Sequence, residues 1–124
     1  MKENLKYCNI CGKVIDLIND SKVPTICCGK EMELLKANTS DGAVEKHVPV
    51  YEINKDEIII TVGSIEHPMV EDHYIMWISQ IKDNTTMTTK LFPNQEPKAR
   101  FKYMKNATIF AYCDKHGLWM NKVE

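Results

Sequence analysis

One stretch near the end of the chain carries both a strand signal and two candidate metal ligands: Ala107-Thr108-Ile109-Phe110-Ala111-Tyr112-Cys113-Asp114-Lys115-His116-Gly117-Leu118-Trp119. Its first half is rich in β-branched and aromatic residues, which predicts a buried strand that ends at Cys113. His116 follows on a loop, next to a glycine that permits a tight turn. A thiolate and an imidazole held in this way suit a soft transition metal. A lone pair of this kind is more often a buried cysteine beside a surface histidine, so the other cysteines and histidines bear on its meaning.

Strand-like segments separated by turn signals fill the chain from His47 onward. They cover residues 47–53, 57–62, 73–81, 85–92, 99–104, 107–113 and 118–123. Pro49 indicates that the first of them is an edge strand, because proline has no N–H to donate to a sheet. No segment shows helical periodicity with caps. We therefore predict an all-β fold, with a β-sandwich in this part of the chain.

Composition limits the possible classes of function. The chain has 124 residues, 44% hydrophobic residues and a formal net charge of -1. This charge balance argues against a nucleic-acid or membrane-surface partner, which would need a basic face. No apolar run approaches the roughly 18 residues that span a bilayer, and the first residues lack a signal-peptide pattern. We expect a cytoplasmic protein, in which five cysteines are better explained as metal ligands than as disulfides.

The first four cysteines have the spacing of a single metal site. Cys8-x-x-Cys11 is followed by Gly12, which relieves the next turn, and Cys27-Cys28 supplies the second pair. Four thiolates suit tetrahedral iron or zinc. A thioredoxin-like redox motif would leave the second pair unexplained. Because adjacent side chains of an extended strand point in opposite directions, binding through both Cys27 and Cys28 requires a local kink.

A segment this short cannot bury enough apolar area to fold alone, so we expect the ion to supply much of its folding energy. Residues 31–35 are predicted to form its last strand. Residues 37–42 are small and polar, which indicates a linker or mobile loop. We predict two domains, residues 1–37 with the four-cysteine site and residues 38–124 with the β-sandwich.

All four histidines lie in loops or at predicted strand ends: His47, His67, His73 and His116. Taken singly, each is more often an ordinary surface or core residue than a ligand. Loops at one end of a β-sandwich gather functional groups, however, so the four imidazoles could converge with Cys113. Their joint pattern is the basis for a second predicted metal site.

Three motifs together resemble the superoxide reductases. They are Glu45-Lys46-His47-Val48-Pro49, then Glu66-His67-Pro68-Met69 with His73-Tyr74-Ile75, and Cys113-Asp114-Lys115-His116-Gly117-Leu118-Trp119. The cysteines before residue 29 resemble the desulforedoxin-type domain of the two-iron class, desulfoferrodoxin. The resemblance covers essentially the whole chain and assigns a place to all five cysteines and all four histidines. Two residues depart from it: Asp114 stands where the family motif has Asn, and Lys115 adds a positive charge.

The resemblance implies a fold, an activity and a set of partners. The fold would be a desulforedoxin-like or rubredoxin-like domain followed by an immunoglobulin-like β-sandwich. The chain would hold two iron ions, one with four Cys ligands and one with four equatorial His and axial Cys113. It would form a homodimer and reduce superoxide to hydrogen peroxide with external electrons, typically from rubredoxin.

Two residues next to His47 receive roles from the same resemblance. Glu45 would bind the iron in the ferric state only, because a carboxylate prefers the harder ion. Lys46 would attract the superoxide anion to the open coordination position, since a cation beside a site raises encounter rates. Both could instead be ordinary surface charges.

Two functions of other classes fit part of the pattern. In a cupredoxin-like electron carrier, Cys113, His116, Met120 and an upstream histidine such as His47 would bind copper. That interpretation leaves two histidines and the four-cysteine site without a role. In a non-catalytic zinc-binding interaction module, the four cysteines would hold zinc and the histidines would be incidental.

Overall fold

The computed structural model describes residues 4–38 and 42–124. The chain divides into two compact units, one ending at Lys36 and the other beginning at Ala37. We call them the small unit and the large unit. The predicted linker, residues 37–42, lies partly outside the described residues. Asn38 within it is fixed to the large unit, because its N–H donates to the Leu118 carbonyl at 2.8 Å and its Oδ1 accepts the Met120 N–H at 2.9 Å.

The small unit consists of very short antiparallel strands. Its three-stranded sheet has the order β2-β1-β5, and a separate hairpin pairs β3 with β4. Their bounds are β1 Leu5–Tyr7, β2 Val14–Asp16, β3 Ile26–Cys27, β4 Lys30–Glu31 and β5 Glu33–Leu34. The predicted strand over 31–35 is therefore divided between two strands at Met32. Among the described residues of this unit, the buried hydrophobic side chains are Leu5, Cys8 and Met32, which is a very small core.

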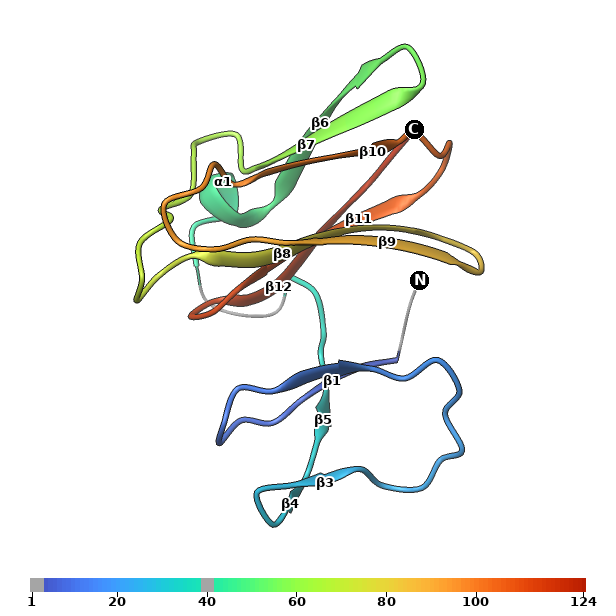
Figure 1. Ribbon diagram of the computed structural model, residues 1–124, viewed down its shortest axis with the longest axis vertical. Helices are drawn as coiled ribbons and strands as arrows, with labels where there is room; N and C mark the ends of the chain where they lie inside the picture. The colour runs from blue at the N-terminus through green and yellow to red at the C-terminus, as the bar shows by residue number, and fades with distance from the viewer. Residues whose placement is uncertain (1–3, 39–41) are drawn as a thin grey trace. The chain divides into compact units, whose positions relative to one another are not determined.

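The large unit is a sandwich of two antiparallel sheets, which Figure 1 shows as two layers. One sheet has the order β10-β7-β6 and the other the order β12-β11-β8-β9. The strands are β6 Pro49–Asn54, β7 Glu57–Val62, β8 Ile75–Lys82, β9 Thr85–Lys90, β10 Lys98–Lys102, β11 Thr108–Cys113 and β12 Gly117–Lys122. The all-β prediction is confirmed, and β6 with Pro49 lies at a sheet edge as predicted.

Two histidines lie outside the strands that they were predicted to open. His47 is the last residue of α1 (Val44–His47), a single helical turn that the sequence did not predict. Val48 is already extended, with φ -68° and ψ 120°, as expected of a residue before proline. The strand therefore begins only at Pro49. His73 precedes β8 and pairs with Val70 in an isolated bridge.

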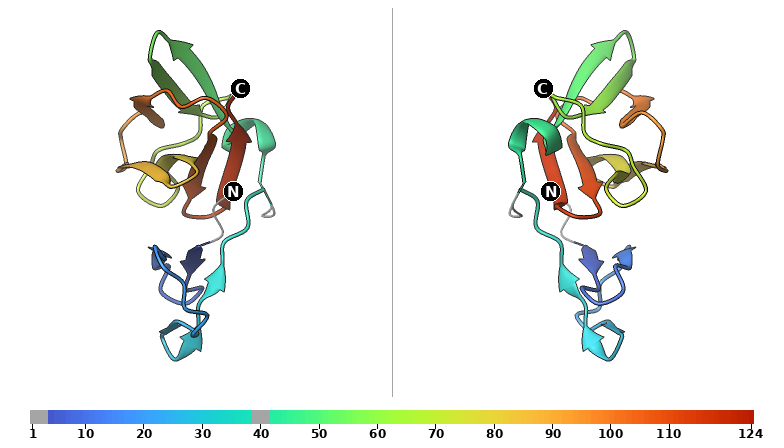
Figure 2. Two further views of the ribbon diagram at one scale, coloured as in Figure 1. Left: turned by 90° about the vertical axis from the view of Figure 1, so that its right-hand side faces the viewer. Right: turned by 90° about the vertical axis from the view of Figure 1, so that its left-hand side faces the viewer.

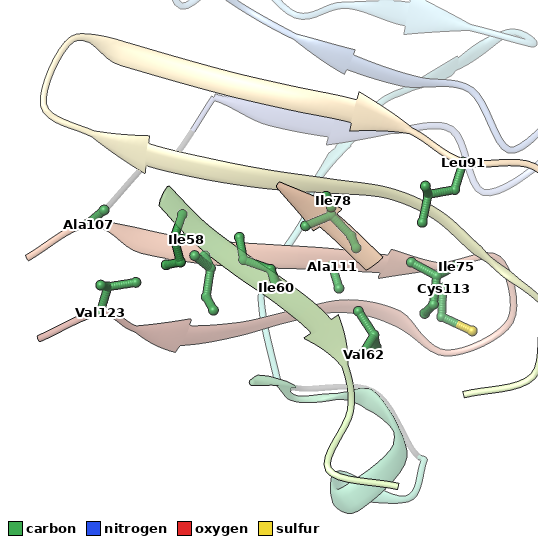
Figure 3. Packing of buried hydrophobic residues seen from close by; sticks show 12 residues of the cluster. Ile58, Ile60, Val62, Ile75, Ile78, Leu91, Ala107, Ala111, Cys113 and Val123 are labelled. Carbon is green, nitrogen blue, oxygen red and sulfur yellow. The ribbon is translucent and has the colours of Figure 1, made fainter. Parts of the chain in front are cut away.

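The core of the large unit ends at the predicted metal ligand Cys113. Alternate residues of β7 and β11 face each other across the two sheets: Ile58, Ile60, Val62, Ile109, Ala111 and Cys113. Figure 3 shows the Cys113 sulfur at one end of this row. In the described parts of the chain, no helix is long and apolar enough to cross a membrane.

Candidate metal centres

The small unit brings its four cysteine sulfurs together. The ligand atoms of Cys8, Cys11, Cys27 and Cys28 all lie within 4.8 Å of one another. Cys11 Sγ is 3.6 Å from Cys27 Sγ, which is 4.0 Å from Cys28 Sγ. Sulfurs about 2.3 Å from a central ion stand about 3.8 Å apart in a regular tetrahedron. The observed separations lie on either side of this value, so the four residues fit a tetrahedral metal ion.

Left-handed backbone positions produce this arrangement. Cys28 has φ +55°, which is the kink that binding through both adjacent cysteines requires. Gly12, after the first pair, has φ +83°.

A cation at the centre of the four cysteines would stabilise their thiolate forms, whose pKa values the surroundings shift in different directions. Backbone hydrogen bonds from Cys11 and Ile10 lower the pKa of Cys8 to about 6, whereas the neighbouring sulfurs of Cys11 and Cys8 raise the pKa of Cys28 to about 12.

The large unit brings together all four histidines and Cys113. Their ligand atoms also lie within 4.8 Å of one another, although they come from α1, the connection between β7 and β8, the end of β11 and the β11–β12 turn. His47, His67 and Cys113 are buried, and His73 and His116 are partly buried. Figure 2 shows α1 close to the red β11–β12 hairpin, where the His47 ring stacks on Trp119 at 5.0 Å between ring centroids.

The four imidazole rings form an approximate square. Neighbouring ring centroids are 4.6 Å (His47–His67), 4.7 Å (His67–His73), 5.1 Å (His73–His116) and 4.7 Å (His116–His47) apart. The diagonal between His47 and His73 is 6.5 Å. His47 Nε2 is 3.1 Å from His67 Nε2 and 3.0 Å from His116 Nδ1. Nitrogens about 2.1 Å from a central ion would form a square with sides of about 3.0 Å.

Cys113 places a fifth candidate ligand atom over one face of this square. Its sulfur is 3.4 Å from His67 Nε2 and 3.8 Å from His116 Nδ1, which stand at opposite corners. Because His47 and His73 occupy the other corners, the sulfur lies above the plane. A register shift helps to place it, since Tyr112 pairs with Trp77 but Cys113 pairs with Ile75. Such bulges redirect side chains next to functional sites.

The protonation of the rings shows that a cation fits this site. The ring Nδ1 atoms of His47 and His67 face the carbonyls of Ala43 and Pro68 at 2.7 and 2.6 Å, so each Nδ1 carries the proton. Burial lowers the pKa of both imidazoles, that of His67 to about 4, which keeps them neutral. Their Nε2 lone pairs therefore face each other at 3.1 Å with no proton between them. A metal ion relieves this repulsion, and such backbone hydrogen bonds are typical of metal-binding histidines.

Two further observations support the same fit. His73 Nε2 is buried and has no hydrogen-bond partner among the described residues. Burial raises the pKa of the Cys113 thiol, so a nearby cation is needed to stabilise the thiolate at neutral pH.

Glu45 and Lys46 lie exposed on α1, directly before His47. The Glu45 carbonyl accepts hydrogen bonds from the Ile65 N–H at 2.9 Å and from Ser64 Oγ at 3.2 Å. Among the described residues, the Glu45 carboxylate is not one of the atoms that converge with the histidines. The structure thus places both residues next to a candidate ligand, and their predicted roles remain predictions.

Sequence reasoning missed the residues that pack around this centre. A Cβ at Gly63 would lie 2.7 Å from the Glu45 carbonyl oxygen, and one at Gly42 would lie 3.2 Å from the His47 ring. Trp119 stacks on His47 and donates its Nε1–H to the His116 carbonyl at 3.0 Å.

The copper ligand Met120 of the cupredoxin alternative is not placed at this centre. It follows Trp119 on β12, so its side chain faces the side of the sheet opposite to Trp119.

Comparisons with known proteins place the chain in a family. The family model described as desulfoferrodoxin matches residues 39–122. This chain belongs to the desulfoferrodoxin family. A desulfoferrodoxin of Syntrophotalea carbinolica is 40% identical over 98% of this chain and 99% of its own length. A desulfoferrodoxin homolog of Archaeoglobus fulgidus is 40% identical over 92% of each chain.

Solved structures agree with this assignment. The superoxide reductase from Treponema pallidum aligns with a TM-score of 0.75 and 25% identity, over 95% of this chain and 98% of its own. The family model covers most of the large unit only, whereas these relatives and this structure extend over both units. Membership of the desulfoferrodoxin family implies that iron is the metal.

Proposed function

We propose that this chain is a superoxide reductase, with its active site at the centre in the large unit. The observation that carries the proposal is the square of four imidazoles beneath one cysteine sulfur, which includes a buried His73 nitrogen without a protein partner among the described residues. The names of its relatives and structural neighbours support the same activity. A blue-copper site would use fewer histidines, and an interaction module would not require this convergence.

The proposed ligands are His47, His67, His73 and His116 around the iron, with Cys113 over one face. When bound, the ferrous ion supplies the electron in the net reaction O2•− + e− + 2 H+ → H2O2. Imidazole ligands add no negative charge and so favour the ferrous state. The Cys113 thiolate would donate electron density to the iron, as cysteine thiolates do in some haem proteins. The face opposite Cys113 is the proposed position of superoxide.

Glu45 and Lys46 receive complementary proposed roles. Lys46 is an exposed cation one residue from His47, and it attracts the superoxide anion. Glu45 is an exposed carboxylate on the same helical turn, and it binds the iron after oxidation. Replacing Glu45 with Ala should change the visible spectrum of the oxidised centre while leaving the rate with superoxide nearly unchanged. An unchanged spectrum would exclude this carboxylate as a ligand.

We propose that residues 1–37 form a separate iron domain and residues 38–124 the catalytic domain. The near-tetrahedral sulfur separations support a second iron held by Cys8, Cys11, Cys27 and Cys28. The proposed external electron donor is rubredoxin, and the proposed compartment is the cytoplasm, where thiols stay reduced.

A homodimer is the proposed assembly. The small unit exposes several large hydrophobic side chains, as a buried contact between copies would explain: Ile10, Ile18, Val23, Ile26 and Leu34. Light scattering during gel filtration tests this, because a dimer has twice the 14.3 kDa of one chain.

Anaerobic purification with metal analysis tests the proposed function. We expect about two iron atoms per chain, separate visible spectra for the two centres, and fast removal of pulse-generated superoxide by the reduced protein. His73→Ala is the informative variant, because it removes one corner of the square and leaves the four cysteines unchanged. It should lose the superoxide reaction and keep the spectrum of the four-cysteine centre. A colourless zinc protein, or one copper per chain, would refute the proposal.

A further inference from the structure

Asp114 links the chain segment that carries His73 to the chain segment that carries Cys113. Its N–H donates to the Tyr74 carbonyl at 3.2 Å, and its carboxylate Oδ1 accepts the Tyr74 N–H at 3.0 Å. Tyr74 directly follows His73, and Asp114 directly follows Cys113. This reciprocal pair therefore fixes the position of the β11–β12 turn relative to the segment that bears His73.

The same carboxylate oxygen lies beside the Cys113 sulfur. Asp114 Oδ1 is 3.8 Å from Cys113 Sγ. The sulfur is fully buried, whereas Asp114 is exposed to solvent. The side chain is a carboxylate, so its negative charge lies close to the sulfur. Backbone hydrogen bonds from Lys115 and His116 to the sulfur stabilise a negative charge on it, whereas the nearby Asp114 carboxylate disfavours that charge.

We propose that Asp114 is a positioning residue that also tunes the electron-donating power of the centre through the Cys113 sulfur. The inference rests on the proposed function, since it concerns iron bound at this centre. A negative charge stabilises the ferric state more than the ferrous state, because the ferric ion carries the larger positive charge. Asp114 therefore lowers the reduction potential and makes the reduced centre a stronger donor of electrons.

Two substitutions separate the geometric role from the electrostatic role. Asp114→Asn keeps an oxygen that can accept the Tyr74 N–H but removes the charge. Asp114→Ala removes both. A matched control is Asp83→Asn, which makes the same charge change at an exposed turn beyond the far end of β8. The eight residues of β8 separate this turn from Tyr74 by about 26 Å.

The experiment is a redox titration of the iron-loaded proteins, followed through the visible absorption of the large-unit centre. We expect Asp114→Asn to retain iron and to titrate at a more positive potential than the wild type, with its sulfur-to-iron absorption moved to shorter wavelength. Asp83→Asn should titrate as the wild type does. Asp114→Ala should in addition lose iron from this centre faster in the presence of a chelator, because the Tyr74 link is gone.

The outcomes distinguish this inference from the function on which it rests. If the wild type reduces superoxide but Asp114→Asn has the same potential and absorption as the wild type, the tuning role is overturned and the function stands. If Asp83→Asn shifts the potential as much as Asp114→Asn, the effect is one of net charge and the inference is equally overturned. If the wild type binds no iron at this centre, both fail together.

Discussion

Gly63 fixes the position of α1 by its lack of a side chain, and Gly63→Ala tests this directly. A Cβ there would lie 2.7 Å from the Glu45 carbonyl oxygen and 2.9 Å from the Lys46 carbonyl carbon, whereas ordinary contact begins at 3.4 Å. The shortfall of 0.7 Å falls on backbone atoms, which cannot rotate away as a side chain can. Because φ of Gly63 is not left-handed, the clash is the main penalty of the substitution.

The expected destabilisation follows from this overlap. Overpacking of this kind costs about 1–3 kcal/mol. In a domain of this size, each kcal/mol lowers Tm by about 4–8 °C. The displaced helical turn also carries His47, so we expect the large-unit centre to bind metal about 10–100-fold more weakly, as for other residues that support metal ligands.

Thermal unfolding and a chelator competition measure the two effects. Gly42→Ala is the graded comparison, because its Cβ would meet side-chain atoms of His47 and His116 at 3.2–3.3 Å and should cost less. Metal binding at the four-cysteine centre should not change in either variant. A Gly63→Ala protein with the Tm and metal affinity of the wild type would refute the idea that this close approach holds α1 in place.

Three further predictions concern the proposed ligands and the steering charge. Cys11→Ser should disturb the small-unit centre but leave superoxide reduction by the pre-reduced large-unit centre nearly intact; loss of that reaction in a variant that keeps the large-unit iron would show that the centres are not separable. Cys113→Ser should lower turnover by at least about 100-fold even where iron stays bound, because a hydroxyl is a harder and normally protonated ligand; stopped-flow kinetics at the native rate would contradict this. Lys46→Ala should slow the reaction with superoxide about tenfold and reduce its dependence on ionic strength; an unchanged salt slope would eliminate the steering role.

The sequence predicted the strands of the large unit well because their signals are local. The prediction for 57–62 matches β7 residue for residue, since a run of β-branched residues follows a clear turn signal at residues 54–56. The helical turn α1 escaped prediction because four residues are too few to show a periodicity, and Ala43 before it provides no side-chain cap. The other strands of the small unit, apart from the predicted segment 31–35, were missed for a similar reason, since they have only two or three residues each.

The candidate ligands were accessible to sequence reasoning because cysteine and histidine are chemically distinctive and few in this chain. The residues that hold them in place were not. Gly63 resembles any turn glycine until the backbone of α1 is seen against it, and Trp119 resembles any strand aromatic until His47 is found on its face. Such roles depend on segments that are distant in the chain, and no local pattern encodes them.

A metal ion held by the square of imidazoles would also act as a cross-link within the fold. His47 and His116, whose ring nitrogens are 3.0 Å apart, are separated by 69 positions in the chain. An ion bound to both closes a loop of that length, in the same way as a disulfide would. On the chain-entropy relation for disulfides, such a loop closure is worth about 4 kcal/mol relative to the open unfolded chain. A metal ion at this centre would therefore connect the beginning of the sandwich to its end.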